Sequence, residues 1–80
     1  MQQDIPTFFM AVVCEASVAG YSQPKDVREY IKRWYGYRYG LRDETICAAQ
    51  RAIAALPADV RTGLISDCQF NYDWKFRRPG

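Results

Sequence analysis

The 80-residue sequence contains no histidine. Histidine is the side chain used most often as a general base and is a common zinc ligand, so its absence removes the usual hydrolytic triads and most metal–water mechanisms. The sequence also has no C-x-x-C pair, because its three cysteines, Cys14, Cys47 and Cys68, lie far apart. We therefore expect no metal site and no cofactor, and we expect the thiols to act as small buried apolar groups in a reducing compartment.

Motifs that bind phosphate and segments that enter membranes are missing as well. Gly36 and Gly40 are not followed by the Lys-Ser/Thr pair of a P-loop and lack the spacing of a dinucleotide-binding loop. No apolar run approaches the roughly 20 residues that span a bilayer. Asp4 stands where a signal peptide carries basic residues. These absences predict a non-enzymatic protein of the cytoplasm that does not associate with membranes.

Charges of the two signs are nearly balanced. Eleven basic and nine acidic side chains give a formal net charge of +2, a field too weak to bind polyanions in bulk, although a local patch can still be basic. The hydrophobic content of 49% is too high for a disordered chain. A chain of 80 residues has room for one core, so we expect a single compact domain over residues 1–80.

Two helices are expected in the first half of the chain. Apolar residues at positions 5, 8, 9, 12, 13 and 16 follow the spacing of a helical stripe, which Asp4 can cap and Gly20 can end. Ser22 and Pro24 are typical of a helix start, because a hydroxyl accepts an amide proton and proline tolerates the first turn. The apolar spacing that follows predicts a second helix over residues 24–35.

Two further helices are expected in the second half. Asp43 fits the N-cap of a third helix, which Pro57 ends. Pro57 can itself open a fourth helix, because its missing amide proton has no intrahelical partner in the first turn. Gly63 lies inside that fourth helix and costs up to about 1 kcal/mol relative to alanine. We therefore expect the fourth helix to be short.

Two other segments alternate between large apolar residues and polar residues or glycine. In the first, Tyr35, Tyr37 and Tyr39 are separated by Gly36 and Arg38, and in the second, aromatic residues alternate between positions 68 and 76. A period of two is typical of an extended strand, and a strand needs a partner for its backbone groups. We therefore predict an α+β fold of three to four short helices with a small two-stranded antiparallel pairing of residues 35–41 with 70–76. The alternative is an all-α bundle with an extended C-terminal tail.

The aromatic and basic residues of these segments predict a binding surface. Tyrosine, tryptophan and arginine dominate the hot spots of protein interfaces, so we expect a protein partner. The expected partner-binding residues are Arg33, Tyr35, Tyr37, Arg38, Tyr39 and Trp74.

Three other interpretations bear on the same segments. The patch could bind nucleic acid by pairing cations with phosphates and stacking rings on bases, although Asp43 and Glu44 lie just beyond it and would repel the backbone. The rings could also pack within the core or a hairpin. The exposed edge of a two-stranded sheet could pair with a second copy, so a homodimer is expected as well.

A small chain without histidine or a catalytic motif, with a tyrosine-rich turn at residues 34–41, resembles the inhibitors that phages carry against host machinery, anti-CRISPR proteins among them. The resemblance is one of size and character, without a shared motif. It implies an inhibitor that occludes a surface of a host ribonucleoprotein or other nucleic-acid-processing complex in the cytoplasm of the host cell. Because the chain is mildly basic, it implies occlusion by contact and not the mimicry of DNA charge.

Overall fold

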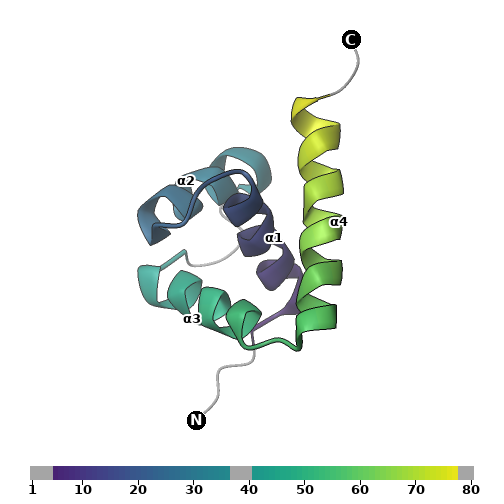
Figure 1. Ribbon diagram of the computed structural model, residues 1–80. Coiled ribbons are helices and arrows are strands. Elements are labelled where there is room, and N and C mark those ends of the chain that lie inside the picture. Colours follow the sequence, from purple (N-terminus) through teal and green to yellow (C-terminus); the bar gives the residue numbers. More distant parts are fainter. Residues whose placement is uncertain (1–4, 37–40, 78–80) are drawn as a thin grey trace.

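The computed structural model describes residues 5–36 and 41–77, and the secondary structure within these ranges is helical. The chain forms α1 (Thr7–Val18), α2 (Pro24–Tyr35), α3 (Asp43–Ala54) and α4 (Ala58–Phe76) in that order. Figure 1 shows α1 in the middle, with α2 and α3 on one side of it and α4 on the other. Accordingly, α1 contacts each of the other helices, and α2 also contacts α3.

The core is built around α1 because this helix is apolar on almost every side. Phe9, Val12 and Val13 are at most 4% exposed, and Ala16 is fully buried. They pack against buried apolar side chains of α2 and α3 in one cluster. The members of the cluster from these two helices are Val27, Tyr30, Ile31, Ile46 and Ala49.

The turn from α1 to α2 depends on Gly20, which has a φ of 99°. The amide of Gly20 donates to the carbonyl of Ser17, and the amide of Tyr21 donates to the carbonyl of Ala16. This pair of bonds is the Schellman arrangement, which ends a helix with a residue in the left-handed conformation. The prediction that Gly20 ends the first helix is confirmed, and the turn places Tyr21 beside α2.

The limits of α2 agree with the sequence, whereas its capping does not. The helix runs from Pro24 to Tyr35, as predicted. Its N-cap is Gln23, which makes no side-chain capping bond, so the predicted capping by the Ser22 hydroxyl is wrong. The Ser22 carbonyl instead accepts a hydrogen bond of 2.7 Å from Nε2 of Gln50 on α3, which ties the α1–α2 turn to α3.

The start of α3 lies one residue from the predicted position. Arg42 is the N-cap and Asp43 is the first helical residue. Asp43 therefore does not cap the helix, but its carboxylate pairs with the guanidinium of Arg28 on α2. A carboxylate in the first turn also interacts favourably with the helix dipole. The helix ends at Ala54, which agrees with the predicted stop before Pro57, because a proline disfavours the helical conformation of the residue that precedes it.

The predicted strand at residues 70–76 is wrong, because these residues belong to α4. At 19 residues α4 is the longest helix, so the expectation of a short fourth helix is wrong as well. The alternating aromatic residues fall into two helical stripes. Cys68 and Tyr72, four residues apart, lie on the side that faces α1, whereas Phe70 and Trp74 lie on the opposite side. No glycine or proline interrupts the chain between Gly63 and Arg77, so the helix can continue through the whole segment.

The α+β fold is therefore wrong for the described part of the chain, and the all-α alternative agrees with it. The extended tail of that alternative is wrong as far as Phe76, which is helical. Tyr35 is the last residue of α2, and residues 37–40 lie outside the described ranges. Residues 5–36 and 41–77 contain no strand. The described part of the chain therefore has no sheet edge of the kind that led us to expect a homodimer.

None of the described helices is both long enough and apolar enough to cross a membrane.

Replacement of Ile46 by alanine tests the packing of α3 against α1. Ile46 is 0% exposed, so Ile46→Ala should lower the free energy of unfolding by about 2 to 5 kcal/mol, as measured by urea denaturation. The same substitution at Ile65, which is 43% exposed, is the control and should cost about 1 kcal/mol or less. Equal losses at the two positions would contradict this packing.

Candidate functional site

Glu15 is the one charged side chain that is buried within the described ranges, with 2% exposure. It lies in the last turn of α1, and three donors from other helices surround its carboxylate. The Tyr30 hydroxyl donates to Oε2 at 2.5 Å, the Tyr35 hydroxyl to Oε1 at 2.8 Å, and Nζ of Lys75 to Oε2 at 2.6 Å. Lys75 also donates to the Tyr35 hydroxyl at 2.7 Å. We call these four residues the Glu15 network.

The Glu15 network joins α1, α2 and the last turn of α4. A buried carboxylate is costly unless donors and a cation surround it, and here both conditions are met. No buried side-chain polar atom lacks a partner in the described part of the chain. Lys75 also lies 4.4 Å from the ring centre of Tyr35 and 5.5 Å from that of Trp34, so its charge interacts with two aromatic faces as well.

The network raises the pKa values of its two tyrosines and of its lysine. Burial and the hydrogen bond to Glu15 raise the pKa of Tyr30. Burial also raises the pKa of Tyr35, and its bond to Glu15 adds to the effect while Lys75 opposes it. Burial works to lower the pKa of Lys75, but its bonds to Glu15 and Tyr35 outweigh burial and raise it. The lysine is therefore a charged donor, and a carboxylate held by three donors is poorly placed to accept a substrate proton.

Two thiols meet in the core beside this network. Cys14 and Cys68 are each 2% exposed, and Sγ of Cys68 donates to the carbonyl of Ala11 at 3.4 Å. Burial raises the pKa of both, that of Cys68 to about 12. Neutral buried thiols are weak nucleophiles. The prediction of buried apolar cysteines is confirmed for this pair, whereas Cys47 is only half-buried.

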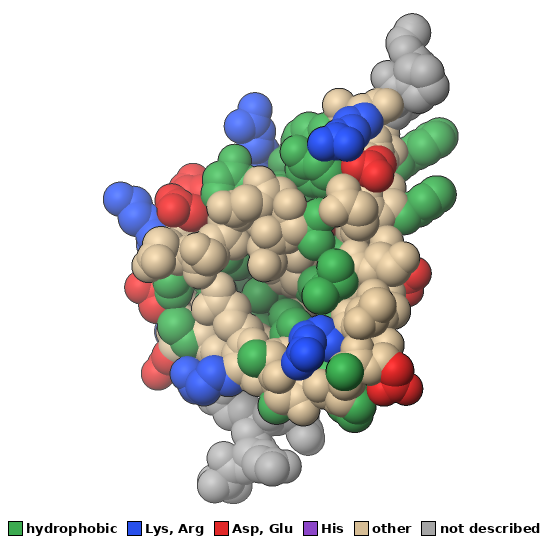
Figure 2. Space-filling model, viewed as in Figure 1, with side chains coloured by type: hydrophobic (Ala, Val, Ile, Leu, Met, Phe, Trp, Pro, Cys, Tyr) green, Lys and Arg blue, Asp and Glu red, His purple; other side chains and the backbone are tan. Residues whose placement is uncertain are grey.

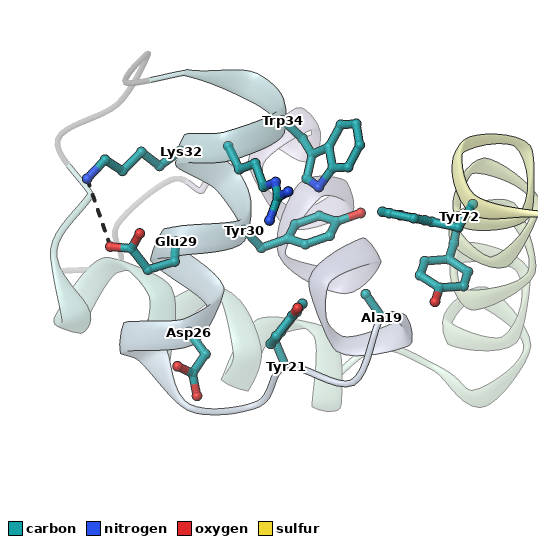
Figure 3. A pocket seen from close by; sticks show the side chains of 10 residues that line it. Ala19, Tyr21, Asp26, Glu29, Tyr30, Lys32, Trp34 and Tyr72 are labelled. Carbon is teal, nitrogen blue, oxygen red and sulfur yellow. Dashed lines mark ion pairs between the residues drawn. The ribbon is translucent and has the colours of Figure 1, made fainter.

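A groove lined by five aromatic rings runs between α2 and the C-terminal end of α4. Figure 3 shows Tyr30 between Tyr21 and Trp34, with Tyr72 approaching from α4. The groove has a volume of about 610 Å³. We call it the aromatic groove, and its rings are those of Tyr21, Tyr30, Trp34, Tyr72 and Phe76.

Charged residues of both signs border the aromatic groove along α2. Asp26 lies in the first turn of the helix, and Lys32 and Arg33 lie in its last turn. Glu29 lies between them and pairs with Lys32 at 3.9 Å (Figure 3). One end of this border is therefore acidic and the other basic, so the groove does not present a surface of one sign to a polyanion.

A second aromatic surface lies on the opposite side of α4. Phe70 is 70% exposed and Trp74 is 63% exposed, and a spacing of four residues places them on the same face of the helix. Figure 2 shows hydrophobic side chains projecting from the outer edge of α4, away from the other helices. We call this pair the α4 ridge. Asp67 and Asp73 lie beside it, and Asp73 is bonded to Gln69 and paired with Arg77.

The structure separates the residues that the sequence grouped into one partner-binding surface. Tyr35 belongs to the Glu15 network, Arg33 borders the aromatic groove, and Trp74 belongs to the α4 ridge. Tyr37, Arg38 and Tyr39 lie outside the described ranges.

The sequence prediction omitted Phe70, which at 70% exposure is the most exposed of the rings in the described ranges. It also missed Glu15 as the centre of a network. A glutamate that interrupts an apolar helical stripe was the available signal, since such a residue must find donors elsewhere in the chain.

Comparison with protein-family models, curated proteins and solved structures finds no match. Within residues 5–36 and 41–77, no group of three histidine, cysteine, aspartate or glutamate side chains could hold a metal ion. The site must therefore be interpreted from its own geometry.

Lys75→Met tests whether the network holds α4 against α1. The substitution keeps an apolar stem but leaves the Glu15 carboxylate without its cation, so the free energy of unfolding should fall by about 2 to 4 kcal/mol in urea denaturation. Arg77→Met is the control, because the side chain of Arg77 is 72% exposed and its ion pair with Asp73 is long, at 3.8 Å. That variant should lose about 0.5 kcal/mol or less. If both variants lost the same amount, the network would not hold the helix.

The raised pKa values predict that stability falls at alkaline pH. Above the ordinary pKa of 9.0 for Cys68 and 10.0 for the tyrosines, the unfolded chain releases protons that the folded protein keeps, so unfolding becomes easier as pH rises. For Cys68 this loss extends up to its raised pKa of about 12. In urea denaturation, any stability advantage of the wild type over Cys68→Ala should shrink by about 1.4 kcal/mol for each pH unit in that window. A constant difference would contradict the shift.

Proposed function

We propose that this protein is a non-enzymatic binding module that docks the α4 ridge into an apolar groove on a protein partner. The observation that carries the proposal is the exposure of Phe70 and Trp74, at 70% and 63%. Exposed rings of this size on neighbouring turns are typical of a helix that binds in the groove of another protein. Rigid aromatic rings also supply contact area at low cost in conformational entropy.

The position of the ridge supports this mode of binding. The ridge lies on the exposed side of α4, whereas Cys68 and Lys75 contact α1 from another side of the helix. Figure 1 shows α1, α2 and α3 together on one side of α4. The Glu15 network holds the opposite face of the helix through Lys75. A helix held in this way loses little freedom on binding, so more of the contact energy contributes to affinity.

The charges beside the ridge are of both signs, since Arg77 pairs with Asp73 at 3.8 Å. Asp67 and Asp73 lie next to the two rings, on a protein whose formal net charge is +2. Proteins that process nucleic acid present basic surfaces to phosphates. The narrower proposal is drawn from the resemblance to phage-borne inhibitors such as anti-CRISPR proteins: the partner is a host nucleic-acid-processing complex. In that role the ridge would occlude a basic surface by contact.

Direct binding of nucleic acid has less support. The α4 ridge has acidic neighbours, and the aromatic groove has charges of both signs. Neither surface matches the continuous basic track that follows a phosphate backbone.

Removal of the ridge is expected to abolish partner capture. The immobilised protein should retain its partner from a lysate of the host cells, and Phe70→Ala with Trp74→Ala should weaken that capture about thirtyfold or more, a loss of at least about 2 kcal/mol. Ile65→Ala, on another face of the same helix, is the control and should retain the partner. Both variants should keep the helical circular dichroism spectrum of the wild type.

Two results would overturn this proposal. One is capture that survives in the folded double variant. The other is binding of duplex DNA whose affinity falls with salt at a slope of about 0.9 per phosphate contacted, which would place the protein among nucleic-acid binders.

A further inference from the structure

The rings of the aromatic groove form a continuous series. Each ring centre lies 4.6 to 6.5 Å from the next, in the order Tyr21, Tyr30, Trp34, Phe76 and Tyr72. Three elements supply them: the α1–α2 turn, α2 and α4. Three of the five rings are accessible, with Tyr21 at 43%, Trp34 at 41% and Phe76 at 44% exposure. A series of neighbouring rings suits an extended ligand better than a single compact one.

The ring planes are inclined to one another. Successive planes make angles of 45°, 46°, 84° and 35°. A flat nucleobase needs a parallel ring on which to stack, and inclined neighbours give it contact with one ring at a time. A corrugated aromatic floor instead suits the puckered rings of proline. Proline-rich segments in the polyproline II conformation bind to aromatic-lined grooves of this kind.

The groove also offers a hydrogen-bond donor to such a segment. A polyproline II helix has no internal hydrogen bonds, so its backbone carbonyls are open to donors. The indole of Trp34 can only donate, and Figure 3 shows its nitrogen on the edge that faces Tyr30. Tyr30 is 4% exposed and its hydroxyl is bonded to Glu15, so it supports the floor of the groove from below and the more exposed rings beside it supply the contact area.

The charged residues of α2 that line the groove indicate which charges a ligand should carry. Asp26 lies in the first turn of α2 and Arg33 in its last turn, whereas Glu29 between them pairs with Lys32. A ligand with a basic residue at the first end and an acidic residue at the second would complement both. The volume of about 610 Å³ falls within the range of peptide and small-molecule sites, roughly 300 to 1,000 Å³.

We propose that the aromatic groove binds a proline-rich segment of a partner protein in the polyproline II conformation, with a basic residue of that segment beside Asp26. This site is separate from the α4 ridge and does not depend on it. A partner could therefore be held at two surfaces, one on each side of α4.

The two tryptophans allow a direct test with the intact protein. Two synthetic peptides of about ten residues, with proline at most positions, would carry arginine at one end and glutamate at the other, in opposite orders, and each would extend about 30 Å. In ¹H–¹⁵N NMR spectra, the indole signal of Trp34 should shift saturably with one of them, with a Kd on the order of 100 μM. The signal of Trp74, assigned from a Trp74→Phe variant, should not move.

Matched variants distinguish binding of the peptide in the aromatic groove from adsorption of the peptide to the exposed rings of the α4 ridge. Tyr21→Ala should weaken binding about tenfold, whereas Phe70→Ala on the α4 ridge should leave it unchanged. A peptide with alanine in place of proline should bind about tenfold more weakly, because it must first be ordered.

Four results would overturn the proposal: no saturable shift with either peptide, equal binding of the alanine peptide, a shift of Trp74 in place of Trp34, or a stronger response to a single-stranded oligothymidylate. None of these results alters the expected effect of the ridge variants on partner capture, so the two proposals fail independently.

Discussion

The buried carboxylate of Glu15 constrains this protein more than any other single group. An ionised carboxylate is tolerated in an apolar interior only where donors surround it. Its donors lie 15, 20 and 60 residues away along the chain, on α2 and α4. The network can therefore form only when the C-terminal half of α2 and the last turns of α4 lie against α1. The position of both aromatic surfaces depends on that arrangement.

The rotation of α4 about its axis follows from the same contact. Each residue advances about 100° around a helix, so a helix that turns Lys75 toward Glu15 and Cys68 toward α1 must turn Phe70 and Trp74 outward. Tyr72, on the inner side, then lies beside the groove. A period-two pattern of aromatic residues thus produces one surface on each side of a single helix. The pattern that suggested a strand in fact distributes large rings over two faces of α4.

The first three helices were largely predictable because local signals mark their limits. Pro24 and Gly36 bracket α2, Gly20 ends α1, and Pro57 separates α3 from α4. The length of α4 could not be predicted from the alternation of aromatic and polar residues alone. The side of α4 that faces α1 includes Lys75, and its partner Glu15 is 60 residues away in the sequence. The aromatic groove was less predictable still. Its rings come from three elements, and their proximity depends on tertiary contacts that no local pattern records.

The apolar surface on α4 is difficult to explain by folding alone. The core cluster consists of side chains from α1, α2 and α3, and α4 adds Cys68 to the buried set. Phe70, with 70% of its surface exposed, therefore contributes little apolar burial to the fold. A polar residue would serve a solvent-facing helical position at least as well, since helix propensities differ by only a few tenths of a kcal/mol, and it would avoid an exposed apolar patch. The proposed role in binding would account for the exposed rings, whereas the stability of the domain does not.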